Sequence, residues 1–324
     1  MGCGSSSDAP EGPRTVVVFG ATGLLGSSVA RALLEDPFRF KVKCVTRRSS
    51  SDKARKLAEL GAIIVTANLD DPKSLERAVD GADTMFLTTH YWEDKNKEKE
   101  VIRGLNAIDA AVHANIRHLV FNGSELVKKY VGRECAHLDS KAGIEEYIRE
   151  VAKIVPGSRA GRAGITYTII RLPFWYENFF TIFKPHKIKH GVYAIALPLE
   201  DNDMEAISVE DVGECVATIF NKPKLYAGKT IGLTAGRLTM KAVVEGFNKQ
   251  FSNRKFEDPK IRCKDFERFQ FVGAKDLAAM FDFFTSDHCV RDYKLTKKLN
   301  SDIRSFDKWL YHSREIIDEE LKKD

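Results

Sequence analysis

The sequence lacks a membrane-spanning run, a disulfide framework and a zinc motif. No apolar run among its 324 residues approaches the ~20 residues of a membrane-spanning helix, and no secretory signal peptide is recognisable. The six cysteines stand far apart, without a C-x-x-C pair or a Cys/His cluster. We therefore expect neither a disulfide framework nor a zinc site, and we expect reduced thiols in the cytosol.

A strong excess of one charge is also lacking. The 51 Lys and Arg residues face 46 Asp and Glu residues, a net charge of +5, and no basic stripe is interleaved with aromatic residues. Direct nucleic-acid binding is therefore not expected. A hydrophobic content of 43% with 30% charged residues is typical of a globular protein, and the length predicts two lobes rather than one small core.

The most informative segment that is present joins an apolar run to three glycines. Val16–Phe19 is a predicted strand, Gly20–Gly26 has the spacing G-x-x-G-x-x-G, and Ser27–Leu34 has helical spacing. Glycines in such a turn let the backbone approach a pyrophosphate, while the helix N-terminus directs its N–H groups and dipole at the anion. The segment predicts a dinucleotide site rather than an ordinary turn between a strand and a helix.

The end of the next predicted strand bears on the choice between NAD and NADP. An NAD-selective site ends this strand with Asp or Glu on the ribose 2′-hydroxyl. Here Phe40–Val45 is followed by Thr46, Arg47 and Arg48, and then by Ser49–Ser51. Guanidinium groups suit a 2′-phosphate because they offer a fork of donors to its oxygens. We expect NADP, held above all by Arg47, whereas Arg48 is alternatively a solvated turn residue.

The alternation of strands and helices predicts a doubly wound parallel α/β sheet of the Rossmann type. Beyond Pro173 the alternation weakens, which predicts a second, smaller α/β lobe. The expected organisation is a leader at 1–14, a cofactor-binding domain at 15–172 rejoined by about 205–222, and a discontinuous smaller lobe at 173–204 and 223–324. The ligand is expected at the carboxyl ends of the strands, near the topological switch point.

Dehydrogenases of the short-chain type carry Tyr-x-x-x-Lys on a helix and a serine after the fifth strand. In this chain the lysine is Lys141 and the serine is Ser124, but His137 occupies the tyrosine position. Lys141 is expected to bind the cofactor ribose, with a solvated i,i+4 pair to Glu145 as the alternative. His137 is either a substitute general acid–base or a helix histidine without chemistry, and we favour the second interpretation.

Two aromatic segments follow predicted strands. Thr88–Trp92 closes the fourth strand, where the backbone is expected to pass the nicotinamide ribose, and Arg171–Phe180 follows the sixth. In the second segment the polar residues Glu177 and Asn178 suit a nicotinamide pocket with one carboxamide partner. The alternative for both segments is packing between the two lobes.

Several motifs, in sequence order, resemble the NmrA-like family of atypical short-chain dehydrogenases, and within it redox-sensing members of animals. They are Gly20–Gly26, Val45–Arg47, Leu69–Asp71, Glu145–Tyr147, Arg171–Pro173, Tyr176–Asn178, Gly228–Leu233 and Gly273–Ala278. The resemblance implies a fold that binds NADP without the usual tyrosine, with the adenine at Asn68 and Leu69. The predicted cofactor contacts are Gly20, Ala21, Thr22, Gly23, Leu24, Leu25, Gly26, Arg47, Arg48, Ser49, Ser50, Ser51, Asn68, Leu69, Thr89, His90, Tyr91, Lys141, Trp175, Tyr176, Glu177 and Asn178.

The same resemblance implies a role in sensing the NADPH/NADP ratio through conformation, oligomerisation and partner proteins. A cofactor-dependent homodimer is part of this expectation, in the cytoplasm and also in the nucleus. The alternative is an NADPH-dependent reductase similar to quinone and isoflavone reductases, with Lys141 or His137 as proton donor. The missing tyrosine favours the sensor.

The first residues match a lipidation pattern. Glycine is second and serine sixth, as N-myristoylation requires. Cys3 offers a second acylation site beside Gly2, and two acyl chains anchor stably where one does not. We expect acylation of Gly2 and Cys3 and a membrane-anchored fraction, with a disordered Gly/Ser leader as the alternative.

Overall fold

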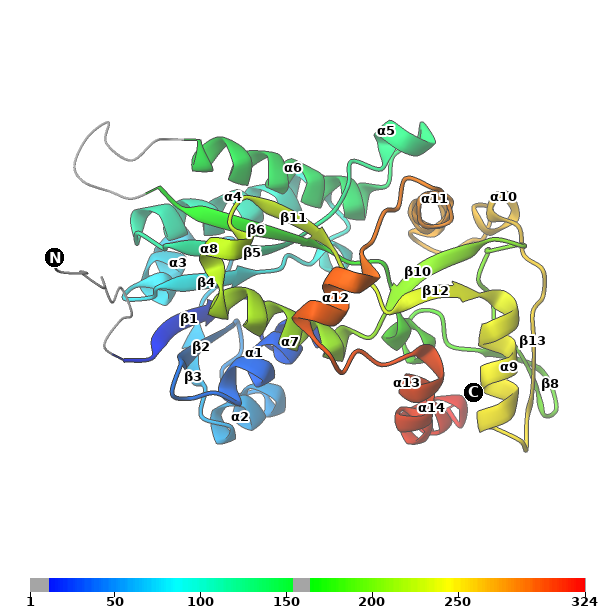
Figure 1. The fold of residues 1–324 in the computed structure, drawn as a ribbon. Coiled ribbons are helices and arrows are strands. Elements are labelled where there is room, and N and C mark those ends of the chain that lie inside the picture. The colour runs from blue at the N-terminus through cyan, green and yellow to red at the C-terminus, as the bar shows by residue number, and fades with distance from the viewer. Residues whose placement is uncertain (1–11, 154–163, 324) are drawn as a thin grey trace, which may run out of the picture.

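Seven parallel strands form the larger sheet, in the order β11-β6-β5-β4-β1-β2-β3 (Figure 1). The computed structural model describes residues 12–153 and 164–323. The strands of this sheet are β1 (Arg14–Val18), β2 (Phe40–Thr46), β3 (Ile63–Thr66), β4 (Thr84–Leu87), β5 (His118–Gly123), β6 (Thr166–Arg171) and β11 (Lys229–Gly232). The predicted doubly wound parallel α/β fold is confirmed.

Helices cover both faces of this sheet, which is why its central strands are apolar on both sides. Val16 and Val18 of β1 pack against the helices of one face and Val17 against those of the other. The first face carries α1 (Leu24–Leu34), α7 (Val209–Asn221) and α12 (Tyr293–Leu299), and the second carries α3 (Pro72–Val79), α4 (Lys97–His113) and α6 (Ala136–Ala152). The shorter helices of this lobe are α2 (Asp52–Glu59), α5 (Lys128–Val131) and α8 (Pro223–Tyr226).

The topological switch point lies between β1 and β4. The chain proceeds from β1 to β2 and β3 on one side, and from β4 to β5 and β6 on the other. In a sheet of this kind the helices leave in opposite directions from that point, so a crevice opens at the carboxyl ends of the two strands. The glycine turn after β1 and the segment after β4 therefore meet there.

A second lobe, shown at the right of Figure 1, follows the sixth strand, and in the described residues it is built of two small sheets, several α-helices and the 3₁₀ helix η2 (Tyr176–Phe180). Its sheets have the orders β12-β10-β7 and β13-β9-β8. The strands are β7 (Phe174–Trp175), β8 (His186–Lys189), β9 (Val192–Ala194), β10 (Asp203–Ile207), β12 (Gly236–Thr239) and β13 (Lys255–Glu257). The helices are α9 (Met240–Gln250), α10 (Cys263–Phe266), α11 (Ala274–Phe284), α13 (Phe306–His312) and α14 (Arg314–Leu321).

The predicted boundaries between the lobes need correction. Residues 223–324 were all expected in the smaller lobe, but β11 pairs with β6 in the large sheet and α12 packs on α7. Residues of about 205–222 were expected to rejoin the first lobe. Helix α7 does so by packing on α1, whereas residues 205–207 belong to β10, in the sheet of β7 and β12. The chain therefore crosses between the lobes more often than the weakening alternation indicated.

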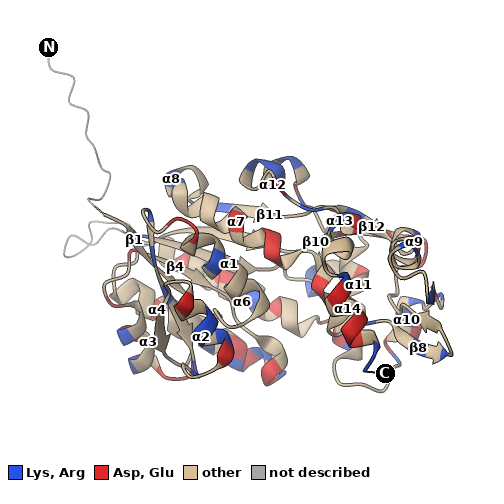
Figure 2. Cartoon of the chain, turned by 90° about the horizontal axis from the view of Figure 1, so that it is seen from below, with Lys and Arg blue, Asp and Glu red and all other residues tan. Residues whose placement is uncertain are grey.

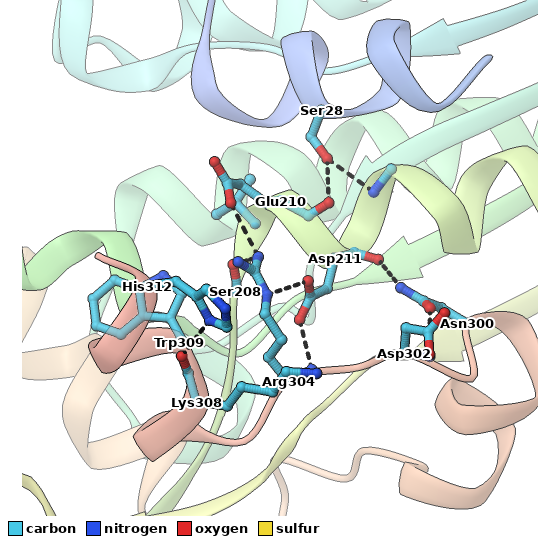
Figure 3. A network of polar contacts seen from close by, with 12 residues as sticks. Ser28, Ser208, Glu210, Asp211, Asn300, Asp302, Arg304, Lys308, Trp309 and His312 are labelled. Carbon is cyan, nitrogen blue, oxygen red and sulfur yellow. Dashed lines mark hydrogen bonds and ion pairs between the residues drawn. The ribbon is translucent and has the colours of Figure 1, made fainter. Parts of the chain in front are cut away.

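Polar contacts fasten α7 to both the first helix and the C-terminal segment (Figure 3). Ser28 of α1 donates its hydroxyl to the backbone carbonyl of Glu210 (2.8 Å). Arg304, just before α13, donates from Nε to Asp211 Oδ1 (2.8 Å) and from Nη2 to Ser208 Oγ (2.9 Å). The pair Arg304–Asp211 is mostly buried, with side-chain exposures of 16% and 9%.

Acidic and basic residues are interspersed over both lobes rather than separated (Figure 2). Within the described residues, no helix is both long and apolar enough to cross a membrane. The predicted acylation sites Gly2 and Cys3 lie outside the described residues.

Candidate functional site

The glycine turn after β1 is shaped by close contacts that leave no room for side chains. Gly20 has φ +70°, and a Cβ there would lie 2.7 Å from Thr88 Cγ2. A Cβ on Gly26 would lie 2.1 Å from the Gly20 carbonyl oxygen. The Gly23 amide donates to that same carbonyl (2.9 Å). The glycines thus let the first turn of α1 pack directly on the turn, next to the end of β4.

The N-terminus of α1 is open to a ligand. Gly23 is its N-cap residue, and within the described chain no side chain caps the helix. Gly20, Gly23 and Leu24 are exposed. Unpaired first-turn N–H groups and the positive end of an 11-residue helix therefore face the crevice, which is the arrangement that binds a phosphate.

Arg47 at the end of β2 is ion-paired with Glu93 across the crevice. Both side chains are partly exposed, at 55% and 35%. The serines that follow Arg47 are exposed or half-buried, and the Ser51 hydroxyl caps α2 by accepting from the Ala54 amide (3.3 Å). Two of the residues expected to bind a 2′-phosphate thus already have partners in this structure. Arg47 pairs with Glu93, and Ser51 caps α2.

Asn68, expected at the adenine, is exposed beyond the end of β3. Its side-chain oxygen accepts from the Asp70 amide (3.1 Å), which orders the turn before α3. The adjacent Leu69 is half-buried, and its carbonyl accepts from Asn106 Nδ2 (2.9 Å). The backbone at this position is thus held in place from both sides.

Lys141 lies in a buried polar cluster after β4. Its ammonium donates to Glu100 Oε1 (2.5 Å) and to the carbonyl and hydroxyl oxygens of Thr89 (3.2 and 3.1 Å). Ser140 also donates to Glu100. Burial opposes the charged form of Glu100, but Lys141 and the two hydroxyls outweigh it and lower the pKa of this carboxyl. The alternative pair with Glu145 does not form.

His137 is not a surface residue but is buried against the second lobe. Its Nδ1 hydrogen-bonds to Asp276 of α11, and Cys135 Sγ lies 3.7 Å from the same nitrogen. His137 does lie on a helix, α6, but buried rather than at the surface, and its role stays a prediction. A histidine oriented by a buried carboxylate has the geometry of a general acid–base, although the contact by itself shows no chemistry.

Cys135, His137 and Asp276 bring potential metal ligands within 4.8 Å of one another. The sequence shows no Cys/His cluster, yet the fold brings Cys135 and His137 together with an acidic residue. The donors fit a metal poorly, because Asp276 already occupies the His137 ring nitrogen. Burial, reinforced by Asp276, also raises the pKa of the Cys135 thiol, which disfavours the thiolate that binds metals.

The short 3₁₀ turn η1 (Tyr91–Glu93) connects the crevice with the second lobe. Its Trp92 ring lies 5.0 Å from the ring of His137. A Cβ on Gly273, at the start of α11, would lie 2.6 Å from Trp92 Cζ3. Burial raises the pKa of the Tyr91 hydroxyl to about 12. His90, which precedes the turn, is exposed.

Glu177 is not available to a nicotinamide carboxamide. It is 2% exposed and accepts from the Ser208 hydroxyl (2.6 Å), the Val209 amide (2.9 Å) and Trp309 Nε1 (3.2 Å). Burial raises the pKa of this carboxyl.

Tyr176 is likewise buried, packed against Trp309 at a centroid distance of 5.3 Å. Tyr176 and Glu177 thus lie in packed contacts, as the alternative interpretation has it, while Trp175 and Asn178 stay partly exposed.

Three residues of the site were missed because their partners are distant in sequence. Glu93 and Glu100 lie on the segment after β4, 46 and 41 residues from Arg47 and Lys141. Asp276 lies 139 residues from His137. The motif Gly273–Ala278 was noted, but no spacing rule connects it with a helix in the other lobe.

Comparisons with known proteins place the chain among relatives of the expected kind. An NmrA-like family domain-containing protein of Dictyostelium discoideum is 28% identical over 256 residues, 76% of this chain and 81% of that protein. The oxidoreductase malD of Malbranchea aurantiaca is 32% identical over 254 residues, 73% of this chain and 72% of that protein. A crystal structure of the negative transcriptional regulator NmrA in complex with NAD superimposes with a TM-score of 0.77 at 18% identity, covering 97% of this chain and 99% of NmrA.

The family model that describes NmrA-like proteins matches residues 13–311, which spans both lobes. The match includes the glycine turn, the basic end of β2, and the Lys141 and Asp276 helices. This chain belongs to the NmrA-like family.

Proposed function

We propose that the chain binds NADP(H) at the crevice between β1 and β4 and acts as a sensor of the NADPH/NADP ratio. The open N-terminus of α1 supports the pyrophosphate site. Arg47, in place of an acidic residue after β2, supports NADP over NAD. Lys141, next to Thr89, supports contact with the ribose. The NAD complex of NmrA supports a nicotinamide dinucleotide in general.

The observation that favours a sensor is the ion pair between Arg47 and Glu93. A 2′-phosphate at Arg47 would meet the Glu93 carboxylate and repel it, because both are anionic. Glu93 belongs to the same short turn as Trp92, which contacts His137 and the start of α11. NADP and NADPH both carry this phosphate, so the linkage through η1 reports occupancy of the site by NADP(H) to the second lobe, and a response to the NADPH/NADP ratio also requires different affinities for the two forms.

Titration of NADP and NAD against the wild type and Arg47→Ala tests the cofactor. Loss of a charge-assisted phosphate contact costs ~1.5–3 kcal/mol, so NADP affinity should fall roughly ten- to a hundredfold and NAD affinity should stay constant. Equal affinity of the wild type for NAD and NADP would contradict the proposal.

Glu93→Gln tests the linkage. This variant keeps the shape of the side chain but removes the competing charge, so NADPH should bind more tightly than to the wild type. The cofactor-induced change in Trp92 fluorescence, assigned with a Trp92→Phe control, should shrink. Unchanged affinity and an unchanged signal would show that η1 is not part of the response.

A second candidate function is an NADPH-dependent reductase, which the His137–Asp276 contact favours. The oxidoreductase name of malD also supports it. NADPH consumption with a panel of quinones and enones distinguishes the candidates. In a reductase, His137→Ala should abolish turnover and leave NADPH affinity unchanged, whereas His113→Ala, an exposed residue at the end of α4, should change neither. Tight binding without turnover supports the sensor.

Self-association and protein partners belong to the same proposal, as do the cytoplasm and nucleus as locations. Self-association is tested by sedimentation of the full chain with and without NADPH. A cofactor-dependent shift from monomer to dimer, or the reverse, is expected.

A further inference from the structure

The second lobe contains a cavity of about 500 Å³ beside η1. A cavity of this size is within the range of small-molecule sites. Its walls come from η1 and from four parts of the second lobe. These are the segment before β8, Ala196 just after β9, helix α10 with the segment that follows it, and the start of α11. The lining residues are Trp92, Lys95, Ile182, Phe183, Lys184, His186, Ala196, Phe266, Phe269, Phe271, Val272 and Leu277.

Most of the wall is aromatic. The Phe266 ring lies 5.3 Å from Phe269, 5.7 Å from Phe271 and 6.3 Å from Phe183, measured between centroids. At the mouth, Phe269, Phe271 and Val272 are 41%, 44% and 73% exposed. Large apolar side chains grouped at the surface mark a ligand or interaction site. The walls therefore suit a ligand with an apolar body.

The charged and titratable members of the lining are basic or neutral. They are Lys95, Lys184 and His186, and no Asp or Glu lines the cavity. The two acidic residues before Lys95 face other cations, since Glu93 pairs with Arg47 and Asp94 with Lys99. Among the described residues, Lys95 itself forms no ion pair.

The backbone of Lys95 supports a functional reason for its position. It has φ +52°, a left-handed conformation that lysine rarely adopts. The Lys95 amide donates to the carbonyl of Tyr91 (2.8 Å), so the turn that places this lysine is fixed by η1. Such backbone outliers cluster at functional sites.

From these observations we propose that the cavity binds a small apolar carboxylate, with the hydrocarbon body against the phenylalanines and the carboxylate at Lys95 and His186. A neutral or cationic molecule would satisfy the walls but leave Lys95 without a counter-ion. The body is aliphatic or aromatic, since both fit the same wall. This site lies in the second lobe, and its existence does not depend on the proposed response to NADPH.

Calorimetric titration of the full chain without NADPH tests the proposal, with dodecanoate, dodecan-1-ol and dodecyltrimethylammonium below their micellar concentrations. Dodecanoate should bind at one site and at least about tenfold more tightly than the alcohol, the usual effect of a charged hydrogen bond. The ammonium compound should bind most weakly. A parallel titration with 2-naphthoate shows whether the aromatic or the aliphatic body is preferred.

Two variants locate the binding. Lys95→Glu should reduce dodecanoate affinity at least about tenfold and leave dodecan-1-ol affinity unchanged, whereas Lys224→Glu on α8, far from the cavity, should change neither. Ala196→Phe should fill the cavity and abolish binding of both compounds, with NADP binding retained as evidence of folding. The proposal is overturned if dodecanoate fails to saturate a site, if the three compounds bind equally, or if Ala196→Phe leaves dodecanoate binding intact.

Discussion

At the scale of single residues, Lys141 is the ion-pair partner of a buried carboxylate and also the proposed ligand of the cofactor ribose. Glu100 is 1% exposed, and Lys141 is its ion-pair partner within the described chain. A variant that removes only the lysine leaves this carboxylate buried without a cation, a change that typically costs ~3–5 kcal/mol. Affinity measured on Lys141→Ala alone therefore mixes lost binding with lost stability.

The double variant Lys141→Met/Glu100→Gln separates these effects, because it removes both charges together. We expect its stability to lie well above that of Lys141→Ala in urea unfolding. Its NADPH affinity should still fall roughly ten- to a hundredfold through the lost ribose contact. If the double variant binds NADPH as the wild type does, Lys141 is a structural residue and does not contact the cofactor.

At the scale of elements, the sequence was most informative where one local rule decides the outcome. The helix Pro72–Val79 is one example, since Asp71 caps it and Pro72 opens it. The strand at Phe40–Val45 extends by one residue, to Thr46. Side-chain partners could not be predicted where the two lobes meet. Nothing local to Glu177 indicates that Ser208 and Trp309 will occupy its carboxylate.

Strand β5 contains a pH-sensitive contact that the sequence did not reveal. His118 is 2% exposed, and its ring nitrogens contact the hydroxyls of Thr166 (2.8 Å) and Thr168 (3.0 Å) on β6. Burial, with a small effect of Arg14, lowers the pKa of His118 from 6.5 to about 4. The imidazole is therefore neutral in the folded chain and protonates more readily when unfolded.

Because the folded-state pKa is the lower one, protonation favours the unfolded chain as the pH falls below 6.5. The contribution of His118 to the free energy of unfolding should fall between pH 6.5 and about 4, by up to about 3 kcal/mol at ~1.4 kcal/mol per pKa unit. In urea unfolding, the stability difference between the wild type and His118→Gln should shrink over this range. A difference that is constant from pH 7 to pH 4.5 would contradict the lowered pKa.

At the scale of the whole molecule, the two lobes are joined by buried ion pairs as well as by aromatic packing. Arg304–Asp211 is one such pair, at 2.8 Å (Figure 3). Arg304→Met leaves Asp211 with a backbone donor but no cation, so we expect a loss of about 3 kcal/mol in urea unfolding. Arg314→Met, an exposed position on α14, is the matched control and should change stability by less than ~0.5 kcal/mol. Equal effects of the two variants would show that the pair contributes no more than a surface arginine.

Attachment of the whole molecule to membranes should depend on its first residues. No described helix is long and apolar enough to cross a membrane. Acyl chains on Gly2 and Cys3 would supply the affinity, because each buried CH₂ contributes ~0.8 kcal/mol. Gly2→Ala should release the chain completely, since palmitoylation of Cys3 normally follows myristoylation. Cys3→Ser should leave weak, reversible attachment, because one chain anchors only marginally.

Fractionation of cells expressing each variant, with mass spectrometry of the N-terminal peptide, measures both effects. A wild-type chain found wholly soluble with an unmodified Gly2 would contradict acylation.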